Sequence, residues 1–371
     1  MSSTSSTQTS SFEIDDRSNE IDSRLILTNQ HLSGAYPASP TYAQYRYCWL
    51  RDGSFIAYAM DREGESESAA AFHRWAAATV LTQAKDIREL IRRSERGEPI
   101  LEHEFLPARF GVDGEWQQDG WPNFQLDGYG HWLWSLGEHL RRARARDVSA
   151  EVVDAARLVG DYLRVFWQEP CYDAWEEYRS QLHTSTLASI YGGLAAMGET
   201  LLPELQAVAA KVRELILEEC VTNGRFVKHI GNPAIDASLL WLSTPFAVVP
   251  EDHPFMIATA EEIELTLNIT GGLRRYNADT FYGGGEWLLL TAWLGWYYTR
   301  LGKLERASEC LAWVESHRDH DGSLPEQVSS EAGNDRFLDY WTRRWGSPAK
   351  PLLWSHAMAL VLRCELQAKE D

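Results

Sequence analysis

The chain has few of the features that mark secreted, membrane-bound or nucleic-acid-binding proteins. Only 5 of its 371 residues are cysteine, and their spacing fits neither a disulfide framework nor a zinc site, so we predict a reducing environment. No run approaches the roughly 18 apolar residues that a membrane-spanning helix needs. Positive charge is also scarce, and the net charge of −19 argues against nucleic-acid and anionic-membrane partners.

The start of the chain has no signal-peptide pattern. Residues 1–11 are rich in Ser and Thr, without a basic start or an apolar core. We therefore expect residues 1–11 to be disordered and the protein to be cytoplasmic. No linker composition interrupts residues 12–371, so this part is predicted to form one domain.

Aromatic side chains, in contrast, are abundant. The chain has 16 Trp and 15 Tyr, and they occur in the predicted loops as well as in the helices. Rings in loops often only border a core, but flat rings also stack on the apolar faces of sugars. Together with carboxylates they favour a site for a small neutral ligand.

Hydrophobic periodicity of 3.6 residues indicates an all-α protein. The predicted helices cover residues 16–32, 52–62, 66–96, 127–142, 149–167, 184–197, 202–221, 235–242, 252–267, 284–301, 303–317 and 350–368. Strand signals are scarce in the rest of the chain.

Long segments separate alternate members of this helix series. They are residues 33–51, 97–126, 168–183, 268–283 and 318–349. Long loops in a compact domain are usually functional. The alternation predicts six helical hairpins in a ring, an (α/α)6 barrel, with the long loops gathered around a pocket at one end.

The segment of residues 170–179 carries two adjacent carboxylates, Glu176 and Glu177, directly after Trp175. A carboxyl group against an indole in a partly dry cleft has a raised pKa, because burial disfavours its charged form. A general acid needs such a raised pKa near neutral pH. The alternative is that both carboxylates are simply solvated at a helix end.

The other long segments contain further polar and aromatic candidates. Arg51 and Asp52 stand at a loop–helix junction, where Asp52 can act as the N-cap or the pair can bind neighbouring sugar hydroxyls. Trp121 precedes a helix and projects into a pocket or serves as a hydrophobic staple. Arg275 precedes a glycine-rich run that lacks phosphate-loop spacing. Glu326 follows a proline, about 150 residues after Glu176.

These residues lie in motifs that resemble glycoside hydrolase family 15, the glucoamylase family, from about residue 45 to residue 359. Each motif is weak alone, but seven occur in the family's order. The motifs are Tyr45-Arg46-Tyr47-Cys48-Trp49-Leu50-Arg51-Asp52, Trp121 before Asp127-Gly128, Trp175-Glu176-Glu177, Ile235-Asp236-Ala237-Ser238-Leu239-Leu240, Arg275-Tyr276 with Asp279-Thr280 and Tyr282, Leu324-Pro325-Glu326-Gln327, and Leu353-Trp354-Ser355-His356-Ala357.

The resemblance implies an (α/α)6 catalytic domain that attacks α-glucosides from the non-reducing end with inversion. By motif match, Glu176 corresponds to the general acid and Glu326 to the general base. Inverting pairs stand roughly 6.5–9.5 Å apart, which leaves room for a water. The resemblance requires no metal and no cofactor. The matched substrate-binding positions are Tyr45, Trp49, Arg51, Asp52, Trp121, Trp175, Glu177, Arg275 and Trp287.

The same resemblance bears on the substrate. A starch-binding module, a secretion signal and the large N-terminal domain of bacterial relatives are not expected here, which favours a short oligosaccharide over starch. The layout is most similar to family members acting on isomaltose, so α-1,6 linkages rank first, α-1,4 second and α,α-1,1 third. A non-catalytic sugar-binding protein and a sugar epimerase or isomerase are the alternatives from other classes. The oligomeric state is not predicted.

Overall fold

The computed structural model describes residues 16–116, 120–143, 148–329 and 333–370. The expected disorder of residues 1–11 lies outside these ranges. Within them the α-helices are α1 (Asp16–Asn29), α2 (Leu50–Glu63), α3 (Ser66–Thr82), α4 (Ala84–Glu95), α5 (Asp127–Ala143), α6 (Ala150–Phe166), α7 (Thr184–Thr200), α8 (Gln206–Glu219), α9 (Pro254–Leu267), α10 (Leu288–Arg300), α11 (Leu304–Ser316), α12 (Asp335–Trp345) and α13 (Leu353–Glu370).

Short elements connect these helices. The 3-10 helices are η1 (Ala43–Tyr45), η2 (Glu102–Glu104), η3 (Pro203–Leu205), η4 (Ala237–Leu242) and η5 (Phe281–Gly283). Three antiparallel pairs of two-residue strands join β1 (Cys48–Trp49) to β2 (Arg109–Phe110), β3 (Val221–Thr222) to β4 (Arg225–Phe226), and β5 (Glu286–Trp287) to β6 (Gln327–Val328).

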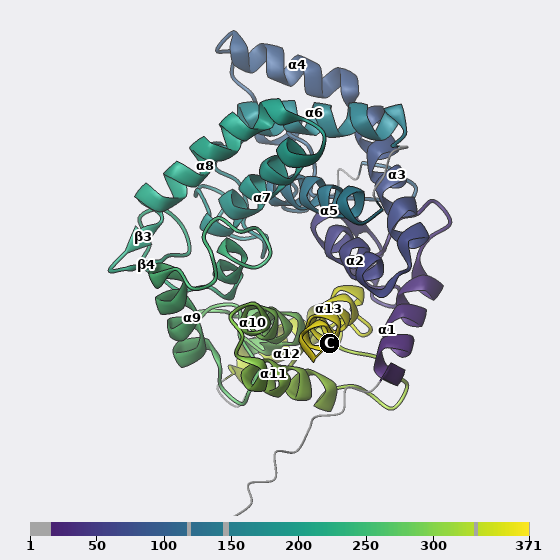
Figure 1. Ribbon diagram of the computed structural model, residues 1–371, viewed down its shortest axis with the longest axis vertical. Coiled ribbons are helices and arrows are strands. Elements are labelled where there is room, and N and C mark those ends of the chain that lie inside the picture. Colours follow the sequence, from purple (N-terminus) through teal and green to yellow (C-terminus); the bar gives the residue numbers. More distant parts are fainter. Residues whose placement is uncertain (1–15, 117–119, 144–147, 330–332, 371) are drawn as a thin grey trace, which may run out of the picture.

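The helices form two concentric layers, as Figure 1 shows. The inner layer contains α2, α5, α7, α10 and α13, and neighbouring members pack on one another except where η4 takes the place between α7 and α10. The outer layer contains α1, α3, α6, α8, α9 and α11. The prediction of an (α/α)6 barrel is therefore confirmed.

Three predicted elements differ from the structure. The helix expected over residues 66–96 is broken at Gln83, and α4 turns away to pack on α6. The segment 235–242 forms a short 3-10 helix whose six residues are all buried, so packing rather than helix propensity determines it. The segment 318–349, expected to be a loop, contains α12, which has no buried residue of its own.

The inner helices approach closely because small residues face one another. A Cβ atom added to Gly193 of α7 would lie 2.3 Å from the carbonyl oxygen of Gly130 in α5. Aromatic rings fill the centre: the ring of Phe55 lies 5.4 Å from that of Trp354 and 5.9 Å from that of Trp241. The abundant aromatic residues are thus partly core and partly, as shown below, site.

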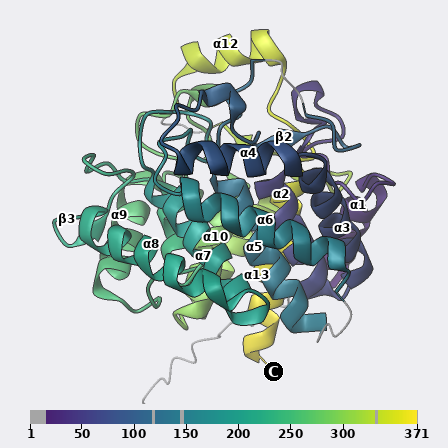
Figure 2. The ribbon, with the colours of Figure 1, turned by 90° about the horizontal axis from the view of Figure 1, so that it is seen from above.

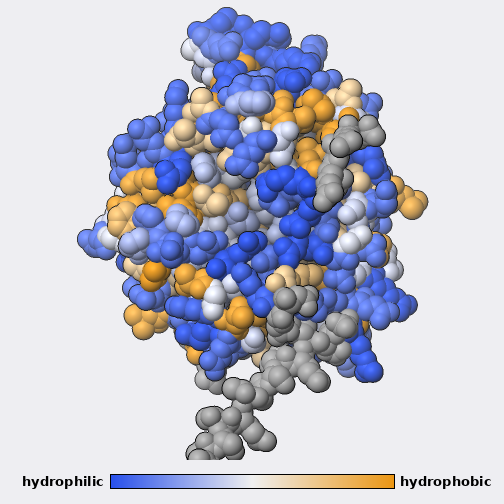
Figure 3. Space-filling view, in the orientation of Figure 1, coloured by the Kyte–Doolittle hydropathy of each residue, from blue (hydrophilic) through white to orange (hydrophobic). Residues whose placement is uncertain are grey.

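The two ends of the barrel differ. Figure 2 shows α12 standing at one end and the C-terminus of α13 at the other. The face shown in Figure 3 is mostly hydrophilic with scattered hydrophobic patches, as expected for a net charge of −19. None of the helices in the described ranges is long and apolar enough to cross a membrane.

Candidate active site

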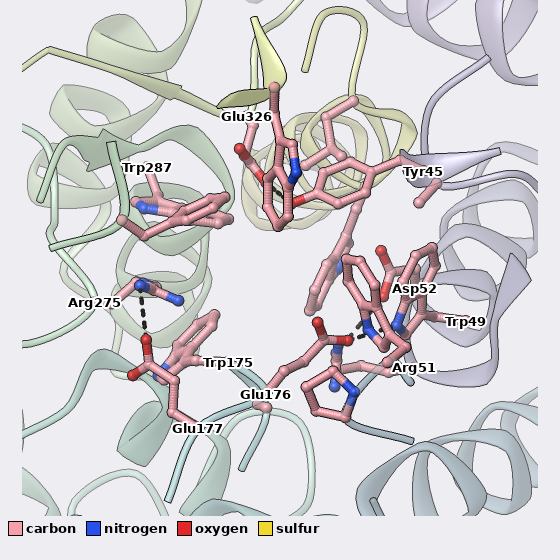
Figure 4. A pocket seen from close by; sticks show the side chains of 18 of the residues that line it. Tyr45, Trp49, Arg51, Asp52, Trp175, Glu176, Glu177, Arg275, Trp287 and Glu326 are labelled. Atoms are coloured by element: carbon pink, nitrogen blue, oxygen red, sulfur yellow. Dashed lines mark hydrogen bonds and ion pairs between the residues drawn. The ribbon is translucent and has the colours of Figure 1, made fainter. Parts of the chain in front are cut away.

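A pocket of about 500 Å³ opens among the long segments, a volume typical of small-molecule sites. Each of the five long segments predicted from the sequence contributes to its wall. All eleven predicted site residues line it: Tyr45, Trp49, Arg51, Asp52, Trp121, Trp175, Glu176, Glu177, Arg275, Trp287 and Glu326. Figure 4 shows Glu176 and Glu326 on opposite sides of the hollow.

A strained turn presents Glu176 to this pocket. The Asp173 carboxylate accepts hydrogen bonds from the backbone N–H groups of Trp175 (3.0 Å) and Glu177 (2.8 Å). The enclosed residue, Glu176, has a φ of 68°, in the left-handed region that costs a non-glycine residue free energy. Asp173 is itself buried beside Lys228, with a separation of 3.4 Å. The turn is therefore imposed by buried charge.

The Glu176 carboxylate has two hydrogen-bond donors on its Oε1 atom. These are the indole Nε1 of Trp49 at 2.8 Å and the amide Nε2 of Gln125 at 3.3 Å. The adjacent Trp175 was expected to supply the indole, but its Nε1 donates to Asp236 instead, at 3.0 Å. The indole that binds the carboxylate thus comes from the first long segment.

Glu177 turns to the other side of the pocket. Its carboxylate accepts a hydrogen bond from the Tyr276 hydroxyl and lies 3.5 Å from the Arg275 guanidinium. Burial raises the pKa of Glu177, and Arg275 and Tyr276 oppose that shift. Asp279 holds Arg275 in place through its Nε at 2.7 Å. The charge of Glu177 is therefore balanced by Arg275 rather than left free beside Glu176.

Glu326 lies immediately before β6, which pairs with β5. Burial raises the pKa of Glu326 to about 7, opposed by a hydrogen bond from the Tyr45 hydroxyl to Oε1 at 2.9 Å. Its other oxygen, Oε2, is buried and has no hydrogen-bond partner among the described residues. A carboxylate with one free, buried oxygen is suited to bind and deprotonate a water.

Helix α13 fixes the segment that carries Glu326. The backbone N–H of Leu324 donates to Nε2 of His356 at 2.9 Å, and the Ser355 hydroxyl donates to the carbonyl of Pro325 at 2.8 Å. Neither His356 nor Ser355 lines the pocket. They position Glu326 from behind, a role that the sequence motif around Trp354 did not reveal.

Arg51 and Asp52 lie in the first turn of α2, where Trp49 is the N-cap, so the predicted capping role of Asp52 is wrong. Arg51 is held by Asp127 at 3.0 Å and by Gln125 at 2.9 Å. Burial raises the pKa of Asp52 to about 7, although Arg51 opposes the shift. Nε of Arg51 and Oδ2 of Asp52 lie 3.6 Å apart as an ion pair, and both are buried without hydrogen-bond partners among the described residues. They form a donor and an acceptor for a polar ligand.

Sequence reasoning missed the wall formed by α12. Trp341, Arg344 and Trp345 line the pocket, and the ring of Trp345 stacks on that of Trp121 at 6.0 Å between centroids. The four-residue spacing of the two tryptophans was a helical signal within a segment taken as a loop. Two further aromatic lining residues without a predicted role are Phe281 and Trp354.

Comparison with known proteins agrees with this geometry. Residues 18–308 match the family model described as Glycosyl hydrolases family 15. The chain belongs to this family. This membership supports the predicted glycoside hydrolase over the alternative of a sugar epimerase or isomerase.

Related proteins are named for different substrates. The chain is 41% identical over 358 residues to "Isomaltose glucohydrolase" of Kribbella flavida, covering 92% of this chain and 90% of the relative. It is 25% identical over 279 residues to "Trehalase 1" of Sulfolobus acidocaldarius, covering 72% of this chain and 48% of the relative.

Solved structures extend the comparison. "Glycosidase Wild Type" superimposes with a TM-score of 0.92 at 39% identity, covering 95% of this chain and 96% of that one. A glucoamylase from Saccharomycopsis fibuligera, at 16% identity and a TM-score of 0.72 over 95% of both chains, shares the fold.

Proposed function

We propose that the chain is an inverting, exo-acting α-glucosidase that releases β-glucose from the non-reducing end of short α-1,6-linked gluco-oligosaccharides, isomaltose first. The observation that carries the proposal is a single pocket of about 500 Å³ with Glu176 and Glu326 on opposite sides. A disaccharide is a suitable occupant for a pocket of this size.

In the proposed mechanism Glu176 is the general acid. Its protonated carboxyl donates to the glycosidic oxygen as the bond to the anomeric carbon breaks. Glu326 is the general base: through Oε2 it takes a proton from a water that attacks the opposite face of the anomeric carbon. Attack from that face inverts the configuration and gives β-glucose. No step needs a metal or a cofactor.

The remaining residues are proposed to hold the sugar. The ion-paired Nε of Arg51 and Oδ2 of Asp52, which have no hydrogen-bond partner among the described residues, suit two neighbouring hydroxyls of the terminal glucose, because buried polar atoms gain most from a ligand that hydrogen-bonds them. Trp49, Trp175 and Trp287 offer ring faces and edges to the pyranose. Tyr45 orients Glu326, and Arg275 orients Glu177. Closure of the pocket around one terminal residue makes the attack exo.

The linkage preference is supported by the relative named for isomaltose, which is far more similar than the trehalases. The aromatic residues of α12, with Trp121, are proposed to contact the leaving sugar. An α-1,4-specific glucohydrolase and an α,α-trehalase are the alternatives. A cytoplasmic role in carbohydrate metabolism completes the proposal.

The test is a comparison of isomaltose, maltose, trehalose, panose and dextran at equal concentrations, with the released glucose followed by proton NMR. We expect isomaltose to have the highest kcat/KM and the β-anomer of glucose to appear first. A higher kcat/KM for maltose or trehalose would contradict the proposed α-1,6 preference and favour an α-1,4 or α,α-1,1 linkage instead. First release of the α-anomer would contradict the inverting mechanism whichever substrate is preferred.

A further inference from the structure

Three metal-ligating side chains meet between helices away from the pocket. Asp61 of α2, His73 of α3 and His139 of α5 each place one ligand atom within 4.8 Å of the other two. We call this set the Asp61–His73–His139 cluster. The three helices pack on one another in pairs and lie side by side in Figure 1.

The cluster belongs to the part of the barrel remote from the glucoside site. Asp61 follows Asp52 by nine residues of α2, which corresponds to about 14 Å along a helix axis. His139 follows Asp127, the first residue of α5, by twelve residues, or about 18 Å. None of the three residues lines the pocket, so the catalytic mechanism does not account for them.

His73 has no partner that explains its burial. Its residue is 2% exposed, and both ring nitrogens are buried without a hydrogen-bond partner among the described residues. A buried polar group left unpaired costs about 1–3 kcal/mol. An apolar ring could fill the same space without this cost. The two unpaired nitrogens of His73 therefore indicate a ligand-binding role.

The other two members already form a pair. Nδ1 of His139 lies 2.9 Å from Oδ2 of Asp61, and these side chains are 13% and 1% exposed. The rings of His73 and His139 lie 5.0 Å apart between centroids. An Asp–His pair beside an unpartnered histidine therefore presents two imidazoles and one carboxylate to a common point, with slight access to solvent at His139.

We propose that the Asp61–His73–His139 cluster binds one divalent zinc ion that ties α2, α3 and α5 together. Two imidazoles and a carboxylate are a ligand set that zinc accepts, with bonds of about 2.0–2.2 Å and a water in the fourth position. Ligand atoms of a tetrahedral site of that size stand about 3.4 Å apart, so a spacing of up to 4.8 Å has to close by at most about 1.4 Å.

The surroundings of the cluster suit a cation. His73 is buried with no hydrogen-bond partner on either ring nitrogen among the described residues, so a lone pair is available to a metal ion. Arg74 is exposed to solvent, which screens its charge from the site. The carboxylate of Asp61 supplies the one negative charge.

The first experiment uses the intact chain after chelator treatment and dialysis. Titration with zinc chloride in a calorimeter is expected to give one site per chain, and saturating zinc is expected to raise Tm by about 3 °C through mass action. Cobalt(II) is a second probe, because its visible absorption reports a low-coordinate site of nitrogen and oxygen ligands. This measurement uses the wild-type protein, so it does not depend on whether a variant folds.

Variants locate the site. His73→Gln and His139→Gln are each expected to lower zinc affinity by more than about 100-fold, since removal of a partner that only orients a ligand already costs 10–100-fold. His320→Gln is the matched control, because the His320 side chain is 91% exposed and lies beside Asp319, and it should bind zinc as the wild type does.

Two outcomes would overturn the proposal. One is a wild-type chain that shows neither stoichiometric zinc binding nor the cobalt absorption. The other is unchanged zinc affinity in both His73→Gln and His139→Gln, which would assign binding to surface histidines. Neither outcome touches the proposed hydrolysis, because the readouts are affinity, stability and absorption rather than glucose release.

Discussion

Two buried acidic regions of the molecule are built in opposite ways. Asp22 of α1 is paired on every side: Arg318 lies 2.7 Å from its Oδ1, His356 2.5 Å from the same oxygen, and Arg363 contacts Oδ2. In the pocket, Asp52 and Glu326 each keep a buried oxygen without a hydrogen-bond partner among the described residues, although Oδ2 of Asp52 lies 3.6 Å from Nε of Arg51. The first region is saturated and the second is left open.

The pKa values follow from this difference. Burial raises the pKa of any carboxyl group, but at Asp22 the charge of Arg363 and the hydrogen bonds from His356 and Arg318 more than offset burial and leave the pKa below its usual value. At Glu326 burial prevails and the pKa rises to about 7. A carboxylate completed by protein partners stabilises the fold, whereas one awaiting substrate or water weakens it.

The two regions are also physically connected. Nε2 of His356 accepts the backbone N–H of Leu324, so its Nδ1 carries the proton and donates to Asp22. The saturated region thereby sets the tautomer of His356, and His356 anchors the segment leading to Glu326. The contacts that stabilise the saturated region therefore also help to position Glu326 in the open region.

The largest expected effect comes from neutralising the two carboxylates that are proposed to transfer protons. Glu176→Gln and Glu326→Gln should each lower kcat on isomaltose by about 10³-fold or more, because each removes a proton-transfer group. Initial-rate assays measure the loss, and thermal unfolding checks that the fold persists. Glu177→Gln is the matched control: its carboxylate faces Arg275 and Tyr276, so we expect mainly a higher KM. Near-normal kcat in either of the first two variants would remove that residue from its role.

The next effect comes from breaking the saturated region. Asp22→Ala leaves Arg363 and His356 buried without their shared carboxylate, and we expect a loss of about 3 kcal/mol in stability, a fall in Tm of about 4 °C. Thermal unfolding at one scan rate measures it. Asp154→Ala removes a carboxylate that is 63% exposed and 3.7 Å from Arg157, and it should change stability by less than about 0.5 kcal/mol. Equal effects in both variants would abolish the distinction between the regions.

The sequence predicted the open region better than the saturated one. Glu176, Glu326 and the aromatic residues lie in loop motifs, where chemistry restricts residue type and spacing. Asp22 and His356 are 334 positions apart, and helical periodicity shows only that each faces inward, not that they meet. The Asp61–His73–His139 cluster could not be predicted for the same reason, because its residues come from three different helices. Helix α12 was missed because its aromatic face covers a ligand pocket and not the core.

A smaller effect has opposite signs in the two regions. The folded pKa of Glu326 is raised from 4.5 to about 7, so the folded state binds more protons between these values and stability falls as pH rises through that window. Glu326→Gln should therefore stabilise the fold at pH 8 and change its stability little at pH 4. The folded pKa of Asp22 is lowered, so Asp22→Asn should lose stability at pH 8 and less as pH falls. Unfolding of both variants across pH tests the signs; a loss of stability in Glu326→Gln at pH 8 would contradict the assignment.

The smallest effect tests a hydrogen bond that partly closes the open region. The Tyr45 hydroxyl donates to Oε1 of Glu326 at 2.9 Å and favours the ionised form. Tyr45→Phe should move the acidic limb of the kcat/KM profile upward by about one pH unit from near pH 7, because a hydrogen bond to a charge contributes about 1.5 kcal/mol. At pH values well above this limb, the rates should return to within a few-fold of wild type.

Tyr42→Phe is the control, since the Tyr42 hydroxyl pairs with that of Tyr282 at 2.6 Å. A loss that persists at high pH would show that Tyr45 binds substrate rather than tuning the base, and an unshifted limb in Tyr45→Phe would mean that a group other than Glu326 controls it.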